Sequence, residues 1–232
     1  MQIKLTPRLE KIAGLVENNR VADIGTDHGY IAIYLIQNNL SNYVIAGDVN
    51  IKPLASAEAN IEGIGLSDKI ETRLGSGLSI LKPNEVDTVI IAGMGGILIS
   101  ELLQLSPEVT ATTKQFILQP MQAQEELRRY LVEGGYKINK DILVKEDHRI
   151  YEILSVDRGQ QEVSNEIQYE IGFYIEDNPK ELAIEFIEGK IRIIKNIISN
   201  IEEIKDEAIK EKLNQCHLKL NALQEVLTCL KK

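Results

Sequence analysis

The feature that most constrains the fold is a repeated alternation of short apolar, β-branched runs with helix-length segments over the first 157 residues. Such runs predict buried strands, and strands that alternate with helices pair in parallel because each helix returns the chain across the sheet. The expected strands are 20–24, 43–48, 70–74, 86–92, 115–118, 137–144 and 151–156. The expected helices are 7–16, 29–37, 53–64, 95–105 and 123–133. Residues 145–150 form a polar connection of hairpin length, so the last two strands predict an antiparallel hairpin that completes a seven-stranded sheet.

After residue 160 the strand pattern ends, and helix formers rich in Glu and Lys take over. Two apolar series repeat with steps of four and three, as in coiled-coil seams. They are Ile187, Ile191, Ile194, Ile198 and Ile201, then Ile209, Leu213, Cys216, Leu220, Leu223, Leu227 and Leu230. The step of eight between the two series predicts a turn, and therefore an antiparallel helical hairpin; recruitment of a second chain is the alternative. We therefore expect two domains, residues 1–158 and a helical domain of residues 159–232.

Composition limits the partners. The net charge is −9, and neither the first 157 residues nor the rest of the chain is basic, which disfavours a broad nucleic-acid-binding surface. Cys216, Cys229 and His217 do not have the spacing of a metal site or a disulfide framework, so we expect no metal. The chain has no apolar run of membrane length and no signal-type N-terminus. We expect a cytoplasmic monomer that does not contact a membrane.

The first strand leads into a turn, Asp23-Ile24-Gly25-Thr26-Asp27-His28-Gly29, that is typical of nucleotide-type cofactor sites. A glycine at position 25 lets the backbone approach a ligand, and the helix that follows favours negative charge at its N-terminus. Asp27 stands where a dinucleotide fingerprint has its second glycine, so a pyrophosphate would meet a carboxylate. This departure argues against NAD and for a cofactor with a positive sulfonium.

Three further turns lie at the carboxyl ends of the next strands, where open α/β sheets bind ligands. Asp48 follows Asp23 by 25 positions, about where a carboxylate accepts hydrogen bonds from ribose hydroxyls. A Gly75-Ser76-Gly77 turn follows the third strand and Gly93-Met94-Gly95-Gly96 follows the fourth. Each turn alone is as often structural as functional, but four in consecutive positions predict a nucleotide-type cofactor.

These residues resemble those of a known family. The run from Asp23 to Tyr30, with 92–96 and the Leu118-Gln119-Pro120-Met121 segment, is similar to the bacterial TrmK family, which methylates N1 of adenine 22 in tRNA. The resemblance covers essentially the whole chain, although the family often has Asn where Met121 stands. It implies a class I methyltransferase fold, a Rossmann-like seven-stranded sheet with a C-terminal helical domain, and S-adenosylmethionine as cofactor.

The resemblance also implies roles for individual residues. With the adjoining Val49 and Met94, the cofactor set is Asp23, Gly25, Asp48, Val49, Gly75, Ser76, Gly77, Gly93 and Met94. The resemblance places Asp27, His28 and Tyr30 at the target base, with Asp27 as candidate carboxylate for the exocyclic amine and Tyr30 as stacking platform. Gln119 is the candidate reader of the Watson–Crick edge. The alternatives are a helix cap at Asp27, a structural role for His28, helix packing for Tyr30, and a strand end at Gln119.

An RNA substrate requires local cations. The candidates are Arg8, Arg128, Arg129, Lys145 and Arg149, with His148 beside the last, each of which could equally belong to a solvated surface. Arg128 and Arg129 point about 100° apart on a helix, so only one should face the site. Two other functions remain open: a methyltransferase of small molecules or proteins, which the acidic charge favours, and a non-catalytic module that docks a partner through its helical hairpin.

Overall fold

The computed structural model describes residues 3–202 and 206–232, which divide into two compact units. The first unit ends at Glu162 and the second runs from Val163 to Lys232. The predicted boundary after residue 158 coincides with the end of strand β7 (Arg149–Arg158), four residues before this division.

The first unit contains one sheet of seven strands in the order β3-β2-β1-β4-β5-β7-β6. Strands β1 to β5 run parallel, and β7 pairs antiparallel with both β5 and β6. Their bounds are β1 Arg20–Ile24, β2 Tyr43–Asp48, β3 Ile70–Leu74, β4 Thr88–Met94, β5 Gln115–Pro120 and β6 Tyr136–Glu146. The order reverses at β1, so β1 and β4 leave a crevice at their carboxyl ends.

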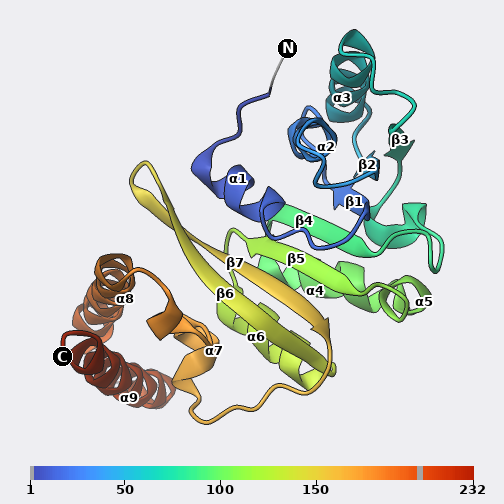
Figure 1. Ribbon diagram of the computed structural model, residues 1–232. Helices are drawn as coiled ribbons and strands as arrows, with labels where there is room; N and C mark the ends of the chain where they lie inside the picture. Colours follow the sequence, from blue (N-terminus) through green and yellow to red (C-terminus); the bar gives the residue numbers. More distant parts are fainter. Residues whose placement is uncertain (1–2, 203–205) are drawn as a thin grey trace. The chain divides into compact units, whose positions relative to one another are not determined.

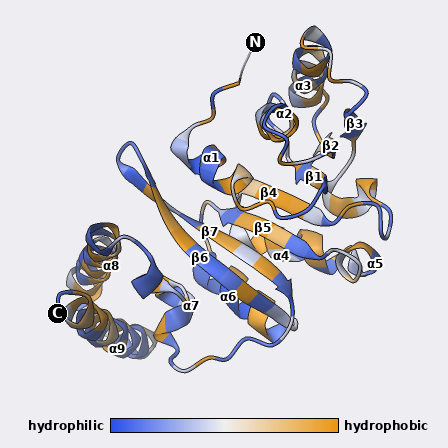
Figure 2. Cartoon of the chain, viewed as in Figure 1, coloured by the Kyte–Doolittle hydropathy of each residue, from blue (hydrophilic) through white to orange (hydrophobic). Residues whose placement is uncertain are grey.

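Helices cover both faces of this sheet (Figure 1). Helices α1 (Pro7–Ala13), α2 (Tyr30–Gln37) and α3 (Ile51–Gly63) form one core with alternate residues of the strands, such as Val21 and Ile90. Helices α4 (Gly96–Gln104), α5 (Pro107–Thr110) and α6 (Gln124–Glu133) belong to the other layer. The central strands β4 and β5 are mostly hydrophobic, as expected for strands that are buried on both faces (Figure 2).

The predicted elements of the first unit are present, and most of their ends differ by one to three residues from the predicted ends. The hairpin turn is tighter than expected, because β6 continues to Glu146 and β7 begins at Arg149. A short 3-10 helix, η1 (Gly77–Ile80), and helix α5 were not predicted. They have only four residues each, too few for a hydrophobic period to be visible in the sequence.

The second unit contains α7 (Ile167–Ile171), a 3-10 helix η2 (Ile175–Asp177), α8 (Lys180–Ile201) and α9 (Glu207–Leu230). An ion pair of 2.7 Å between Lys231 and Glu188 places the end of α9 beside the first half of α8, so the two helices are antiparallel. Both predicted seams are buried or half-buried, and Ile187 and Leu223 are fully buried. The predicted turn includes residues 203–205, which lie outside the described residues.

Candidate functional site

The turn after β1 brings the backbone close to neighbouring strands. Gly25 has a φ of +79°, and its N–H donates to the carbonyl of Gly47 on β2 at 2.8 Å. A Cβ at Gly25 would lie 2.3 Å from Cε of Met94, at the end of β4. Position 25 therefore favours glycine because of the left-handed backbone, and a side chain there would also displace the flexible end of Met94.

A cavity of about 330 Å³ lies along the carboxyl ends of β1 to β4. It contains most of the predicted cofactor-binding residues, and these are Gly25, Asp48, Val49, Gly75, Ser76, Gly77, Gly93 and Met94. Gly93 has a φ of +80°, and a Cβ built there would meet nothing within 4 Å. A side chain at position 93 would thus extend into open space that a ligand can use instead.

A second cavity of about 260 Å³ adjoins the first, and the two share Gly25, Ala92 and Gly93 as lining residues. It is lined by Asp23, Asp27, Tyr30 and Arg8, together with apolar residues of α1 and α2. All nine residues predicted to bind the cofactor therefore line one of two neighbouring cavities. The residues predicted to face a substrate divide: Asp27 and Tyr30 line the second cavity, whereas His28 and Gln119 are outside its lining.

Asp23 is the buried carboxylate of this site, with only 4% of its surface exposed. Burial raises the pKa of its carboxyl to about 6, and the nearby charge of Asp48 adds to this rise. A carboxylate buried in this way has a strong preference for a cationic ligand, because an opposite charge offsets the lost hydration.

Asp27 differs from Asp23 in exposure, since 81% of its side chain is accessible. Helix α2 begins at Tyr30, one residue after the predicted start; the residue that precedes it is Gly29, and no side-chain hydrogen bond caps the helix. The capping alternative for Asp27 is therefore wrong. Its carboxylate instead lies 3.3 Å from Nε2 of His28, and the His28 ring stacks on Tyr30 with centroids 5.4 Å apart.

Gln119 and Arg8 form a contact that the sequence did not indicate. Arg8 Nη1 donates to Oε1 of Gln119, whose Nε2 donates to the carbonyl of Pro120 at 2.9 Å. Gln119 is fully buried, so the prediction that it reads the edge of a base is corrected. Its amide holds the Arg8 guanidinium, which also lies 5.1 Å from the ring centroid of Tyr151. The alternative for Gln119, a residue at a strand end, agrees with β5 ending at Pro120.

The predicted RNA contact of Arg128 is wrong. Its side chain is fully buried between α6 and the β6–β7 hairpin, where its Nε lies 2.8 Å from Asp141 and its Nη2 lies 2.7 Å from Glu152. A buried guanidinium that already has two carboxylate partners cannot reach a phosphate.

The remaining predicted cations lie at the surface. Arg129 forms an ion pair of 3.0 Å with Glu125, one helical turn away, and its side chain is 38% exposed. Lys145 and Arg149 are both exposed and flank the turn of the β6–β7 hairpin. The backbone N–H of Arg8 donates to Glu146 at 3.0 Å, so the turn end of this hairpin contacts α1 beside the second cavity.

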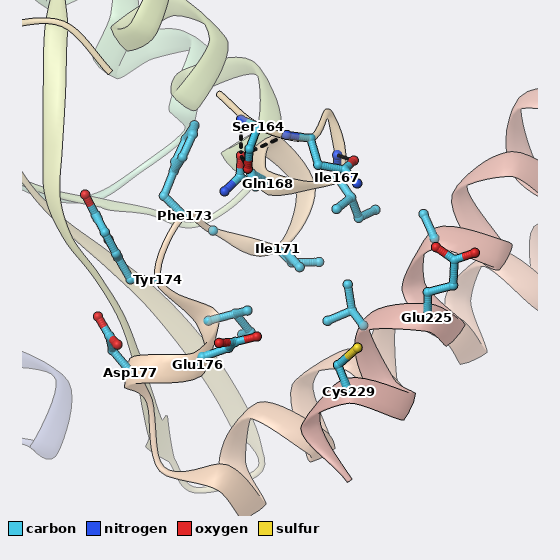
Figure 3. A pocket seen from close by; sticks show the side chains of 15 residues that line it. Ser164, Ile167, Gln168, Ile171, Phe173, Tyr174, Glu176, Asp177, Glu225 and Cys229 are labelled. Carbon is cyan, nitrogen blue, oxygen red and sulfur yellow. Dashed lines mark hydrogen bonds between the residues drawn. The ribbon is translucent and has the colours of Figure 1, made fainter. Parts of the chain in front are cut away.

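A third cavity, of about 520 Å³, lies entirely within the second unit (Figure 3). Apolar side chains of α7 and α9, such as Ile171 and Val226, form part of its wall, and Glu176, Asp177 and Glu225 are acidic residues around it. Its lining contains neither a cation nor a run of glycine turns. It is larger than the cavities at the sheet but lacks the chemistry that a nucleoside or an RNA phosphate requires.

Sequence reasoning missed several residues that line the cavities of the first unit. They are Leu9, Ile31, Asn50, Leu98 and Leu102, with Gly47 on β2. Asn50 could have been predicted, because it follows Asp48 in the same turn. In the structure its N–H donates to the Asp48 carboxylate at 2.6 Å. The apolar residues could not have been predicted, since each fits equally well into a helix that packs on the sheet. The described residues contain no group of His, Cys, Asp or Glu arranged to hold a metal ion.

The sheet order and the glycine turns at its carboxyl edge define a class of protein. A family model for methyltransferase domains matches residues 5–154, and the chain belongs to this family. The predicted fold class, a Rossmann-like seven-stranded sheet followed by packed helices, is confirmed. No helix in the described ranges has both the length and the apolar character needed to cross a membrane.

Within that family the chain is similar to enzymes that modify tRNA. The tRNA (adenine(22)-N(1))-methyltransferase of Bacillus subtilis (strain 168) is 29% identical, over 97% of this chain and 98% of that protein. The crystal structure of the B. subtilis m1A22 tRNA methyltransferase TrmK superposes with a TM-score of 0.88, covering 97% of this chain and 100% of that one, at 29% identity. The structure of M. capricolum TrmK with S-adenosyl-homocysteine has a TM-score of 0.83 at 29% identity, with coverage of 97% and 99%.

Proposed function

We propose that this chain transfers a methyl group from S-adenosylmethionine to N1 of adenine 22 in tRNA. The observation that carries the proposal is the pair of adjoining cavities at the sheet edge, one lined by glycine turns and one by Asp27 and Tyr30. Two ligands must meet in a methyl transfer, and the shared wall at Gly25 and Gly93 is where two occupants would touch. Similarity over nearly the full length to a tRNA (adenine(22)-N(1))-methyltransferase supports this substrate.

The residues present fit the proposed cofactor. Asp48 ends β2 in the position of a ribose-binding carboxylate, and exposed Val49 beside it offers an apolar contact for a base. The buried carboxylate of Asp23 suits a ligand with an ammonium and a sulfonium group. When bound, S-adenosylmethionine supplies an electrophilic methyl carbon on a positively charged sulfur. Gly93, where a side chain would enter the cavity, leaves that space to the ligand.

We assign the part of the second cavity at Asp27 and Tyr30 to the target adenine, and its buried end at Asp23 to the cofactor. The base must leave the stack, because N1 is engaged in pairing within a helix. Tyr30, which is 39% exposed, offers a ring for stacking, and the Asp27 carboxylate can accept a hydrogen bond from the exocyclic amine. As the N1–C bond forms and the C–S bond breaks, positive charge moves to the purine, and Asp27 stabilises that charge. Most of the rate then arises from holding N1 in line with the methyl carbon.

Arg8 supplies the cation of this cavity. Its Nε is buried and has no hydrogen-bond partner among the described residues, although Nη1 is held by Gln119. A bound nucleotide that accepts from Nε would satisfy a donor that is otherwise left unpaired. Lys145 and Arg149, which flank the hairpin turn beside the Arg8 contact, extend the positive charge toward the rest of the RNA.

The test is transfer of tritiated methyl from S-adenosylmethionine to an unmodified tRNA transcript. We expect label in the transcript and none in a matched transcript with guanine at position 22. Nucleoside analysis should identify the product as 1-methyladenosine. Absence of label from every RNA would refute the substrate, and label that persists in the guanine-22 transcript would refute the position. Label in a small molecule or protein would instead support the alternative that the acidic charge favours.

We further propose that the enzyme acts as a monomer in the cytoplasm, where tRNA is modified. The apolar seams of α8 and α9 face each other within one chain, so neither seam needs a second copy to cover it. Light scattering of the purified chain should give a mass near the 26.0 kDa of one copy. A mass of two copies would contradict the monomer.

A further inference from the structure

His28 has a partner at each of its two ring nitrogens. Nδ1 lies 2.7 Å from the Ser56 hydroxyl on α3, and Nε2 lies 3.3 Å from the Asp27 carboxylate. An ionised carboxylate only accepts hydrogen bonds, whereas a hydroxyl can donate or accept. In the neutral ring, Nε2 must therefore carry the proton that faces Asp27, and Nδ1 must accept from Ser56. The Ser56 hydroxyl thus matches the tautomer that directs an N–H at Asp27.

The same helix also holds the backbone of His28. Nδ2 of Asn60 donates to the His28 carbonyl at 3.0 Å, one turn of α3 after Ser56. His28 has a φ of +59°, a left-handed conformation that a side-chain-bearing residue keeps only when its surroundings hold it there. Between these two contacts, a Cβ at Gly29 would lie 3.3 Å from Cβ of Ala57, so α3 packs directly on the turn. Three positions on one face of α3 therefore determine the geometry of the turn.

We propose that Ser56 is a positioning residue for Asp27, which it controls through the His28 imidazole, with Asn60 as a second anchor of the same turn. The inference rests on the proposed function, in which Asp27 faces the target adenine. Without the Ser56 contact, the ring loses the partner that fixes its rotation, and the exposed Asp27 carboxylate loses the fixed N–H that faces it. Because the His28 ring also stacks on Tyr30, the same serine influences two of the side chains that line the second cavity, Asp27 and Tyr30.

The first experiment needs no RNA. Nitrogen-15 spectra of the free protein report each imidazole nitrogen, and the three histidines are assigned with His28→Gln and with the surface variants His148→Gln and His217→Gln. Ser56→Ala should shift the Nδ1 resonance of His28 and the carboxyl carbon resonance of Asp27. Ser56→Thr, which retains a hydroxyl, should restore both. The exposed Glu58→Ala, on the same helix, is the matched control and should change neither.

The second experiment measures methyl transfer to tRNA. Ser56→Ala should lower kcat about tenfold with an unchanged KM for S-adenosylmethionine and an unchanged melting temperature, and Ser56→Thr should recover most of the rate. In an Asp27→Asn background, Ser56→Ala should lower kcat no further, because Ser56 acts on kcat through the Asp27 carboxylate.

The outcomes separate the two proposals. If wild-type chain does not methylate tRNA, the proposed function fails, while the spectra still decide whether Ser56 controls His28 and Asp27. Ser56→Ala spectra identical to wild type would overturn the positioning role, as would rate losses that add fully to those of Asp27→Asn.

Discussion

Residues 23–25 and 27–30 belong to one turn, yet the structure holds them by different means. The first part is buried and built by the backbone: Asp23 is 4% exposed, and Gly25 donates to the carbonyl of Gly47. The second part is built by side chains, since Asp27 is 81% exposed and its carboxylate lies against the His28 ring. The cofactor binds in every catalytic cycle, and a rigid backbone site suits it. The target base is part of a large RNA, so its site must be accessible from the surface.

A substitution in the exposed part of the turn, residues 27–30, should have the largest effect on the rate of methyl transfer. Asp27→Asn removes the charge that stabilises the cationic purine but leaves the cofactor cavity intact. We expect kcat for tRNA methylation to fall by about 10² to 10⁴, with cofactor affinity unchanged by calorimetry. Turnover equal to wild type would show that the accessible carboxylate is not catalytic and would remove this contrast between the two parts.

A substitution in the buried part of the turn, residues 23–25, should change the free energy of unfolding. The Asp23 pKa rises from 3.8 to about 6 on folding, so the native state favours the protonated carboxyl, and the ionised form carries a penalty. This penalty is absent below pH 4, grows as pH rises to 6 and is complete above it, reaching at most about 3 kcal/mol. Asp23→Asn should therefore increase the free energy of unfolding at pH 8 but not at pH 4, measured by urea titration. Asp27→Asn, with its exposed side chain, is the matched control and should show no such gain.

The backbone-built part of the turn should not tolerate a side chain at position 25. Gly25→Ala combines a left-handed φ with a Cβ that would displace the terminal methyl of Met94, a residue that lines the cofactor cavity, and we expect about a hundredfold loss of S-adenosylmethionine affinity by calorimetry. Gly65→Ala is the control, because Gly65 has a φ of +70° but open space around its Cβ position. It should lower stability by about 1 kcal/mol and leave affinity unchanged. Equal affinities for both variants would contradict the close approach at Gly25.

Stacking on Tyr30 should have a smaller effect. Tyr30→Ala removes the ring that faces the second cavity, and base stacking contributes about 1–3 kcal/mol, so the KM for tRNA should rise about tenfold. Tyr30→Phe keeps the ring and should behave as wild type. A loss in Tyr30→Phe as large as in Tyr30→Ala would instead assign the effect to the hydroxyl.

The weakest effect should come from the hairpin. Arg149→Ala should raise the Kd for tRNA a few-fold and reduce the salt dependence of binding by about one unit of slope. Arg20, exposed at the amino end of β1 and thus at the opposite edge of the sheet, provides the control substitution Arg20→Ala. If tRNA binding depends on salt concentration equally in both variants, the hairpin does not contact the RNA.

The two parts of the turn also differ in how far the sequence predicts them. Glycines and acidic residues at strand ends mark backbone-built sites, and all nine predicted cofactor residues line the two cavities. Contacts between side chains far apart in the sequence carry no such mark. The contact of Arg8 with Gln119 spans 111 positions, and that of His28 with Ser56 spans 28. For the same reason Arg128, whose partners lie on β6 and β7, looked like a surface cation.

The fold was more predictable than the site, with exceptions that have local causes. The ends of β1, β2 and β3 agree with the prediction, because polar residues or turns bound their apolar runs. Strand β4 continues to Met94 through an irregularity after Ala92, where Gly93 interrupts the apolar pattern. Helix α7 has only five residues, and no sequence period identifies a helix so short.

The burial of Arg128 changes how the formal charge of the chain should be interpreted. Among the described residues the buried charged side chains are Asp23, Arg128, Asp141 and Glu152, which together carry a formal charge of −2. These side chains still count toward the net charge of −9, so their burial does not weaken the long-range repulsion of a polyanion. Burial removes them from direct contact with an RNA, whereas Lys145 and Arg149 stay exposed at the hairpin turn, and an acidic isoelectric point does not exclude a local cationic surface there.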